Sequence, residues 1–248
     1  MSASCAVRCP PTSGPGRLRS LTGRPEPAFA DHCFCGWLVC SRGDAHEYAG
    51  DDAPNAPGTR TGGVPLTPPG FEWPRCRECG GPMQFLAQIG LSDVDPVSAG
   101  VLSIFMCQND PGLCDEWDAN AGGNRAFVFG SDATDVVSVP DDGVCLLEET
   151  SAVDFVQVQT DDYLEARERW ARDTGRSVLD VLGQVRGLPA WLQNDETPAC
   201  SVCREPMSFV VQLEEGHNHQ TAANFGDGGC DYGFRCTSCR RAAFLRQR

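Results

Sequence analysis

Two nearly identical stretches of this chain carry cysteines at a spacing typical of metal ligation. CRECGGPMQFLAQ begins at Cys76 and CSVCREPMSFVVQ begins at Cys200, so the pattern Cys-x-x-Cys-x-x-Pro-Met-x-Phe-x-x-Gln occurs twice, 124 residues apart. Two cysteines separated by two residues fold into a knuckle that presents both sulfur atoms to one ion. Two such pairs complete a tetrahedron around zinc. The repeat therefore indicates one half of a zinc site in each part of the chain.

A second pair of cysteines follows each knuckle at the end of an apolar stretch. In the second half the spacing is again Cys-x-x-Cys, and in the first half six residues, QNDPGL, separate the pair. Asp-Pro-Gly is turn-forming, so this longer spacer can still bring its cysteines together. A site of four cysteines has no open coordination position, so we expect two structural Zn²⁺ ions and no catalytic metal. The predicted ligand sets are Cys76, Cys79, Cys107 and Cys114 in the first half, and Cys200, Cys203, Cys236 and Cys239 in the second.

Two other roles for these thiols remain open. Some of them could be small buried apolar residues, as free cysteines often are. A redox role fits less well, because neither Cys-x-x-Cys motif stands at the strand-to-helix junction that lowers a thiol pKa. A further metal site in the N-terminal part of the chain is a weaker alternative, because its spacing is irregular; it would draw on Cys5, Cys9, His32, Cys33, Cys35 and Cys40.

The composition limits the cellular compartment and the classes of binding partner that we expect for this chain. The 248 residues include 34 acidic and 20 basic ones, the latter all arginine, for a formal charge of −14. Such an acidic protein repels phosphate backbones, which argues against non-specific binding to nucleic acid. The sequence has no apolar stretch long enough for a secretory signal or a membrane span, so we expect a cytoplasmic protein with no membrane partner. In that compartment thiols stay reduced, and 15 cysteines are better explained by metal than by disulfides.

The elements that must position these cysteines are mostly strands. Short apolar runs with partial alternation predict strands, and one longer segment predicts a helix. That helix begins near Asp161 and ends at Gly175, with Leu164 among the residues on its buried side, and a second short helix is plausible over 177–185. We therefore predict a β-rich α+β fold. The expected strands cover residues 83–91, 100–107, 124–130, 144–149, 151–159, 208–215 and 231–236.

The repeat extends beyond the cysteines and divides the chain. A shift of 124 residues superimposes eight identities within a 26-residue window, which predicts an internal duplication. The halves cover about 62–150 and 186–248, with a helical connection over about 151–185. Residues 1–61, rich in Pro, Gly, Ser and Ala, are expected to be a disordered extension or the product of a start codon placed too far upstream.

Several other residues could do chemistry but lack a recognisable catalytic pattern. His217 and His219 lie beside two glutamates, Asp227 lies in a Gly-rich loop, and the stretch CDEWD carries three carboxylates. Solvated histidines, a tight β connection and a capped turn are the plainer interpretations. Gln88 and Gln212 end the strands that follow the two knuckles, and their role is left open.

Three blocks of the sequence resemble a known family. PRCRECGGPMQFLAQI, GLPAWLQNDETPACSVCREPMSFVVQL and NFGDGGCDYGFRCTSCRRAAFLRQ are similar to the signature blocks of the YwqG-like family, a bacterial domain of unknown function. A more distant similarity links them to the programmed-cell-death-2 proteins, which are associated with chaperoning a ribosomal protein. The resemblance implies a duplicated, β-rich α+β fold over residues 62–248. It supplies no catalytic residue.

These observations favour a non-catalytic, zinc-stabilised scaffold that binds a protein or peptide, with a chaperone-like role as one form. An acidic groove would suit a basic partner. The first alternative is an enzyme with a site between the halves, built from His217, Asp227 or the CDEWD carboxylates. A further alternative is a nucleic-acid-binding zinc ribbon, although no nucleic-acid partner is expected from the charge. Its basic cluster would comprise Arg235, Arg240, Arg241, Arg246 and Arg248. The partner and the oligomeric state are left open.

Overall fold

The computed structural model describes residues 36–41, 55–158, 162–217 and 223–248, the first of these segments for its backbone alone. The chain divides into two units, Met1–His32 and Cys33–Arg248, and all described residues belong to the second. Within the described ranges no helix is long and apolar enough to cross a membrane.

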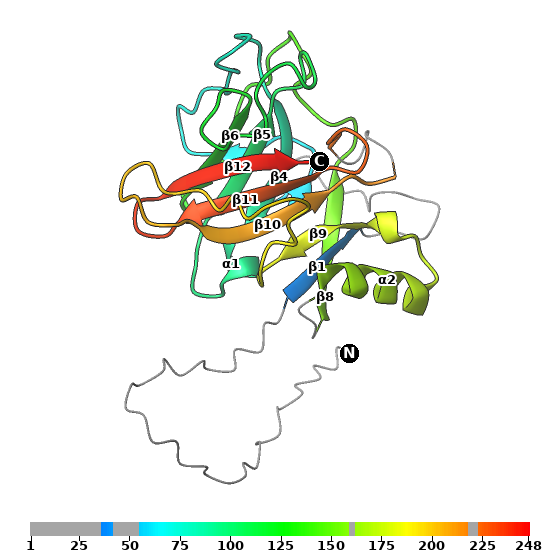
Figure 1. The fold of residues 1–248 in the computed structure, drawn as a ribbon. Helices are drawn as coiled ribbons and strands as arrows, with labels where there is room; N and C mark the ends of the chain where they lie inside the picture. Colours follow the sequence, from blue (N-terminus) through cyan, green and yellow to red (C-terminus); the bar gives the residue numbers. More distant parts are fainter. Residues whose placement is uncertain (1–35, 42–54, 159–161, 218–222) are drawn as a thin grey trace, which may run out of the picture. The chain divides into compact units, whose positions relative to one another are not determined.

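A ten-stranded antiparallel sheet dominates the second unit (Figure 1). Its strand order is β12-β11-β10-β9-β1-β8-β2-β4-β5-β6, and a separate pair is formed by β3 (Leu66–Thr67) and β7 (Asp135–Val136). Three short helical elements accompany the strands: α1 (Leu91–Val94), α2 (Tyr163–Thr174) and the 3-10 turn η1 (Val178–Asp180). The strands of the large sheet are β1 (Gly36–Ser41), β2 (Arg60–Thr61), β4 (Gln84–Gly90), β5 (Val101–Met106), β6 (Asn124–Phe129), β8 (Ser151–Val158), β9 (Val181–Val185), β10 (Ser208–Glu214), β11 (Cys230–Cys236) and β12 (Arg241–Gln247).

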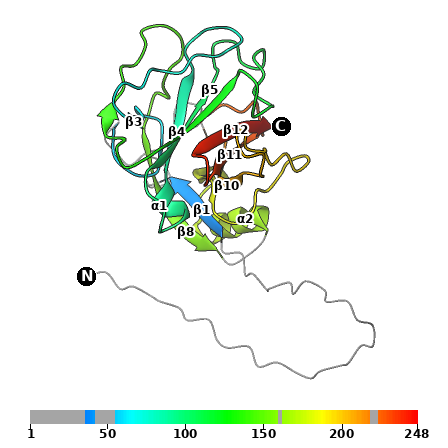
Figure 2. The ribbon, with the colours of Figure 1, turned by 90° about the vertical axis from the view of Figure 1, so that its left-hand side faces the viewer.

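The sheet folds over on itself, so that its two terminal strands, β6 and β12, lie alongside each other. Strands β10, β11 and β12 cross in front of β4, β5 and β6 in Figure 1, and Figure 2 shows the same two layers from the side. One apolar core lies between the layers and includes Leu102 and Ile104 of β5 and Val211 of β10. Gly233 of β11 lies at this core, where a Cβ would come within 2.9 Å of a Val211 methyl group and 3.4 Å of Leu102 and Ile104.

Strands β2, β4, β5 and β6 repeat the connectivity of β9, β10, β11 and β12. Arg60 of β2 pairs with Gln88 of β4, and Gln184 of β9 pairs with Gln212 of β10, at positions that differ by the sequence offset. The pairing also shifts register at matching points. The shift follows Phe85 in β4 and Phe209 in β10. Both halves thus contain a knuckle followed by the same meander of strands.

Helix α2 forms close to its predicted bounds. The side chain of Asp162 accepts a hydrogen bond from the Glu165 backbone N–H at the first turn, and Gly175 ends the helix with φ 70°. Tyr163 and Trp170 pack against the sheet. Leu164 was expected on the buried side but is 57% exposed, because the buried face runs through Tyr163, Ala166 and Trp170 instead.

The structure corrects three other expectations. Residues 177–185 hold only the short turn η1 and then strand β9, because the segment pairs on both sides, with β1 and with β10. Residues 144–149 form no strand, and Leu146 makes only an isolated bridge to Phe85. Within residues 1–61, expected as an extension, residues 36–41 form β1 between β8 and β9, and residues 60–61 form β2. In all three cases the secondary structure depends on pairing between strands that are distant in sequence, which a local sequence pattern does not reveal.

Candidate metal centres

The structure brings together the sulfur atoms of each predicted ligand set. In both sets the four Sγ atoms lie within 4.8 Å of one another. The Sγ atoms of Cys79 and Cys107 are 3.6 Å apart, and those of Cys203 and Cys236 are 3.7 Å apart. A tetrahedron with metal–sulfur bonds of about 2.3 Å has sulfur–sulfur edges of about 3.8 Å, whereas a disulfide bond measures about 2.05 Å. The separations therefore fit four thiolates around one metal ion.

Backbone hydrogen bonds build the first knuckle. The N–H of Cys76 donates to the Gly81 carbonyl at 2.9 Å, and the N–H of Gly80 donates back to the Cys76 carbonyl at 3.0 Å. Gly80 has φ 74°, in the left-handed region that glycine favours. A further bond from the Met83 N–H to the Pro74 carbonyl joins the knuckle to the start of β4.

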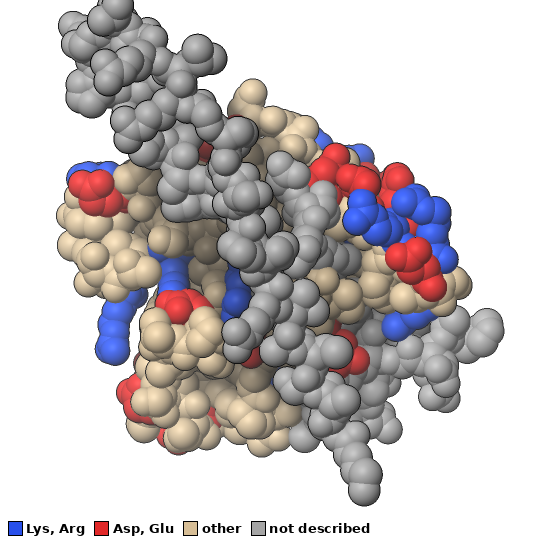
Figure 3. Space-filling model, turned by 90° about the horizontal axis from the view of Figure 1, so that it is seen from below, with Lys and Arg blue, Asp and Glu red and all other residues tan. Residues whose placement is uncertain are grey.

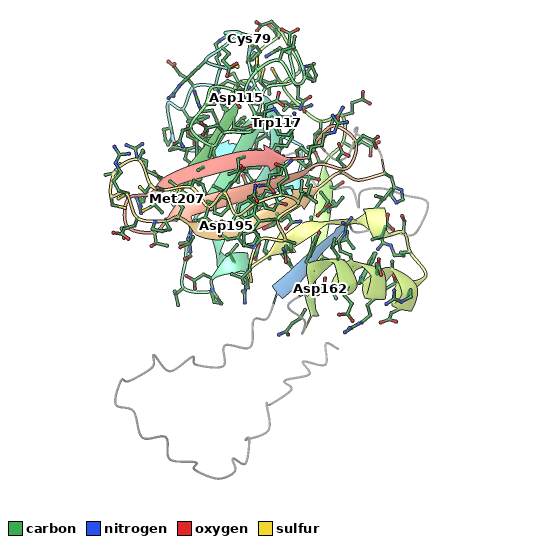
Figure 4. All side chains as sticks on the ribbon, in the orientation of Figure 1. Cys79, Asp115, Trp117, Asp162, Asp195 and Met207 are labelled. Carbon is green, nitrogen blue, oxygen red and sulfur yellow. The ribbon has the colours of Figure 1, made fainter. Side chains whose placement is uncertain are left out.

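The second knuckle uses the same bonds at equivalent positions. Cys200 donates to the Glu205 carbonyl at 2.8 Å, Arg204 donates to the Cys200 carbonyl at 2.9 Å, and Met207 donates to Pro198. Arg204 adopts φ 66° at the position that Gly80 occupies in the first knuckle. Figure 4 labels Cys79, in the first knuckle, and Met207, which follows the second, at separate places on the molecule.

Donor groups close to the sulfur atoms favour the thiolate form that a metal requires. The backbone N–H groups of Cys203 and Val202 lower the pKa of Cys200 to about 6. The side-chain amide of Asn109 donates to the Cys107 sulfur at 3.4 Å. Burial acts in the opposite direction at Cys107, whose pKa it raises. A bound cation would overcome that burial penalty, since coordination deprotonates a thiol.

Each knuckle rests on its own aromatic cluster. In the first, Cys76 and Cys107 pack with Met83, Phe85 and Phe105, where Met83 and Phe85 belong to the repeated motif. The second cluster is equivalent and comprises Cys200, Met207, Cys230, Tyr232, Phe234, Cys236, Ala243 and Leu245. The Pro-Met-x-Phe part of the motif thus starts the strand that supports the knuckle. A metal bound at either set would therefore act on the same segments as core packing.

Two further described cysteines lie outside the ligand sets. Cys145 and Cys230 are both buried, and burial raises the pKa of each thiol. They fit the interpretation of cysteine as a small apolar core residue. The proposed additional site in the N-terminal part of the chain lies outside the described residues, apart from the backbone of Cys40.

The repeated glutamines hold an incoming loop against the sheet. The side-chain oxygen of Gln88 accepts the Leu66 backbone N–H at 3.0 Å, and that of Gln212 accepts the Ala190 N–H at 2.9 Å. These partners are again separated by the sequence offset. Both glutamines are almost completely buried, so each satisfies a backbone donor that water does not reach. The sequence showed that the glutamines repeat, but not what they bind.

Among the described residues, those suggested for catalysis make separate contacts. His217 contacts Asp180 at 2.6 Å, and burial lowers the pKa of the histidine. The loop holding Asp227 wraps around the carboxylate of Glu215, which accepts the N–H groups of Phe225, Asp227 and Gly228. His219 lies outside the described residues.

The carboxylates of CDEWD have structural partners of their own. Asp115 accepts the N–H groups of Trp117 and Asp118 and so forms a capped turn. Glu116 is fully buried and pairs with Arg246 at 2.7 Å. The Arg246 guanidinium also lies 4.2 Å from the centre of the Trp117 ring. The Glu116–Arg246 ion pair joins the loop that follows Cys114, in the first half, to strand β12 of the second half.

Sequence reasoning missed the buried charged residues. Arg60 is buried and donates to the carbonyls of Ala56, Gly62 and Val64, so that one guanidinium holds the loop before β3. Asp231 is completely buried in β11, and burial raises its pKa well above the usual range. The five-arginine cluster considered for nucleic acid is also divided, because Arg235 pairs with Asp95 and Arg246 with Glu116.

Comparisons with known proteins identify a family but no activity. A family profile described as "Domain of unknown function (DUF1963)" matches residues 59–236. The uncharacterized protein YpfL of Salmonella typhimurium is 36% identical over 64 residues, which are 25% of this chain and 14% of that protein. This chain therefore spans a small part of that relative. No solved structure matches the chain.

Proposed function

We propose that this chain, which belongs to the DUF1963 family of domains of unknown function, is a zinc-stabilised scaffold that binds a basic segment of another protein and catalyses no reaction. The observation that carries the binding role is an acidic pocket beside the first metal centre. The resemblance to the YwqG-like family, the distant similarity to the programmed-cell-death-2 proteins and a cytoplasmic location remain part of the proposal.

Zinc is the metal that best fits the two ligand sets. Four sulfur donors in a tetrahedral arrangement favour Zn²⁺ or an iron–sulfur centre over the hard cations that prefer oxygen. Two Cys-x-x-Cys knuckles supported by strands are typical of structural zinc ribbons. When bound, the metal would stabilise the fold, because zinc binding in small peptides is worth about 10–16 kcal/mol and is coupled to folding. The ligands would be the two predicted cysteine sets.

We also infer that the two halves arose by duplication. The repeated knuckle bonds, the matching register shifts and the paired roles of Gln88 and Gln212 support this origin. In a duplicated fold each half would keep its own metal-binding knuckle, while the surfaces beside the two knuckles could differ. The binding role would then belong to a surface that is present in one half and not in the other.

The acidic pocket has a volume of about 670 Å³ and lies between the first metal loop and the second half. Four carboxylates line it, from Glu78, Asp115, Asp118 and Glu196, and none of them has an arginine partner in the described part of the chain. Figure 4 labels Asp115 near Trp117. Three of these carboxylates, those of Glu78, Asp115 and Asp118, accept backbone N–H groups, which hold them in place.

Apolar side chains at the same pocket fit the stem of a long basic residue. Leu113 is 81% exposed and Trp117 is 41% exposed, and both line the pocket. Exposed large apolar residues beside carboxylates suit arginine or lysine, whose methylene stems pack while their charged ends form ion pairs. The partner of this pocket would therefore be a basic peptide segment rather than an acidic one.

Fluorescence anisotropy with a labelled oligo-arginine peptide tests this role in the zinc-loaded protein. The double variant Asp118→Asn/Glu196→Gln should weaken binding about three- to thirtyfold, since each of the two exposed charges contributes roughly 0.3–1 kcal/mol. The matched control, Glu165→Gln/Glu168→Gln, removes equal charge from the exposed face of α2. Equal weakening in both variants would mean that net charge alone attracts the peptide, and the proposed pocket would be wrong.

A further inference from the structure

A groove with the opposite charge lies along the seam between β6 and β12. It has a volume of about 440 Å³, and four arginines line it: Arg77, Arg125, Arg240 and Arg241. No acidic side chain is among its lining residues in the described ranges. In a chain of formal charge −14, a groove of this composition is unexpected.

These four arginines differ from most others in having no carboxylate partner within the described part of the chain. Seven other arginines form ion pairs there, namely Arg75, Arg167, Arg169, Arg172, Arg176, Arg235 and Arg246. The face drawn in Figure 3 illustrates the usual pattern, with acidic and basic side chains next to each other. The groove thus gathers four arginines that have no carboxylate partner among the described residues.

The arginines come from both halves of the fold. Arg77 stands inside the first knuckle and Arg125 in β6, while Arg240 follows the second cysteine set and Arg241 begins β12. Burial and the nearby charge of Arg77 lower the pKa of Arg125. The Arg125 guanidinium donates only to the backbone carbonyls of Ala121 and Asn124 among the described residues. Arg77 and Arg125 therefore place like charges near each other, and no carboxylate lines the groove in the described ranges.

Two residues of β6, Asn124 and Phe127, also line the groove. Asn124 lines it, is 2% exposed and has a side-chain oxygen with no hydrogen-bond partner among the described residues. Phe127, half-buried in β6, adds an aromatic ring to the lining.

We propose that the β6–β12 groove is a binding site for a small phosphorylated ligand, whose phosphate oxygens contact the four arginines. Guanidinium groups bind phosphate oxygens in pairs of parallel hydrogen bonds, and several converging cations favour a multiply charged anion over a single carboxylate. The volume suits a ligand of about nucleotide size. The half-buried ring of Phe127 would suit a flat ring such as a nucleobase. The proposal does not depend on the acidic pocket or on its basic partner.

One rival explanation makes a different prediction. A zinc ion with four thiolates carries a charge of −2, so Arg77 and Arg240 could serve only to offset the charge of the neighbouring metal centres. That role requires no added anion. It predicts loss of zinc when these arginines are removed and no saturable binding of phosphate compounds.

Isothermal titration of the zinc-loaded full chain with tripolyphosphate, and separately with a nucleoside triphosphate, tests the proposal. We expect saturable binding at one site per chain, which weakens with added salt. The variant Arg77→Gln/Arg241→Gln should lower the affinity at least about tenfold, since charge-assisted hydrogen bonds are individually strong. A higher affinity for the nucleoside triphosphate than for tripolyphosphate would indicate that the nucleobase also contributes to binding.

Matched variants keep the test decisive. Arg169→Gln/Arg172→Gln removes the same charge from helix α2, away from the groove, and should bind like the wild type. Arg125→Gln leaves both knuckles untouched and should also weaken binding. Absence of binding at millimolar concentration would overturn the proposal, as would equal losses in groove and helix variants. Binding of an oligonucleotide but of neither small phosphate would also overturn it. Zinc content is measured for every variant. Loss of zinc in the groove variants, without phosphate binding by the wild type, would identify the rival role of offsetting the charge of the metal centres.

Discussion

Replacing the buried glutamines should show how strongly the two halves depend on one repeated contact. We consider Gln88→Leu and Gln212→Leu, which keep a side chain of similar size and remove its polar atoms. In the first variant the Leu66 N–H and the Gly58 carbonyl lose their partner. In the second, the Ala190 N–H and one Glu214 oxygen lose theirs, and the Gln184 amide loses one of its two bonds while keeping that to the Leu188 carbonyl.

The magnitude follows from the number of groups left without a partner. A buried donor or acceptor without a partner costs about 1–3 kcal/mol, and the apolar replacement recovers part of this. We therefore expect losses of about 2–4 kcal/mol in the free energy of unfolding for Gln88→Leu and about 3–5 kcal/mol for Gln212→Leu. Domains are commonly stable by about 5–15 kcal/mol, so both variants should remain folded but weakened.

Urea unfolding in buffered zinc, followed by tryptophan fluorescence, measures these losses. The control is Gln157→Leu, an exposed position on β8, which should change stability by less than about 0.5 kcal/mol. Losses no larger than that of the control would refute the assigned role of the glutamines. The reverse order, with Gln88 more costly than Gln212, would refute the count of lost partners.

Three further predictions concern buried charge and backbone geometry. Burial raises the pKa of Asp231, whereas an aspartate in the unfolded chain has a pKa of about 3.9. At pH values between these two pKa values only the folded protein keeps the proton, so the stability of the fold falls as pH rises through this range. Asp231→Asn should therefore raise the unfolding temperature at pH 7, with little effect near pH 4; equal effects at both would contradict this. Arg246→Met leaves Glu116 buried without its partner and should cost about 3–5 kcal/mol in urea unfolding, less at low pH, where Glu116 protonates; a loss independent of pH would argue against the pair. Gly183→Ala places a Cβ 1.9 Å from the Gln212 carbonyl oxygen at φ 143°, so we expect little folded protein by circular dichroism; a native spectrum would contradict the β9–β10 pairing.

The cysteine geometry could be predicted from sequence because its determinants are local. Cys-x-x-Cys closes its own turn, and the second pair stands at the end of a strand that leads back to it. The offset of 124 residues then made each set evidence for the other. Helix α2 was equally accessible, since Asp162 and Gly175 mark its ends in the chain itself.

Pairing between distant segments could not be predicted in the same way. The segment VLGQV looked like the continuation of a short helix, yet it is strand β9 because β1 and β10 supply its partners. Residues 36–41 lie in a polar, Pro-rich context, yet they form a strand beside β8. Local composition describes neither neighbour, so both segments were misassigned.

The charged side chains were the least predictable part of the site. Arg240, Arg241 and Arg246 stand close together in sequence, but Arg246 points to Glu116 while the other two line the groove with Arg77. Alternation along β12 sends neighbouring side chains to opposite faces, so sequence proximity did not predict spatial proximity. Net charge likewise concealed an acidic pocket and a basic groove on one molecule.

Zinc content, measured by elemental analysis on protein purified under reducing conditions, tests the central claim most directly. The two cysteine sets predict two zinc ions per chain for the wild type and one for Cys200→Ser, with the first-half site still filled. A folded, fully reduced wild-type protein that contains no zinc, or a Cys200→Ser variant that retains both ions, would contradict the account.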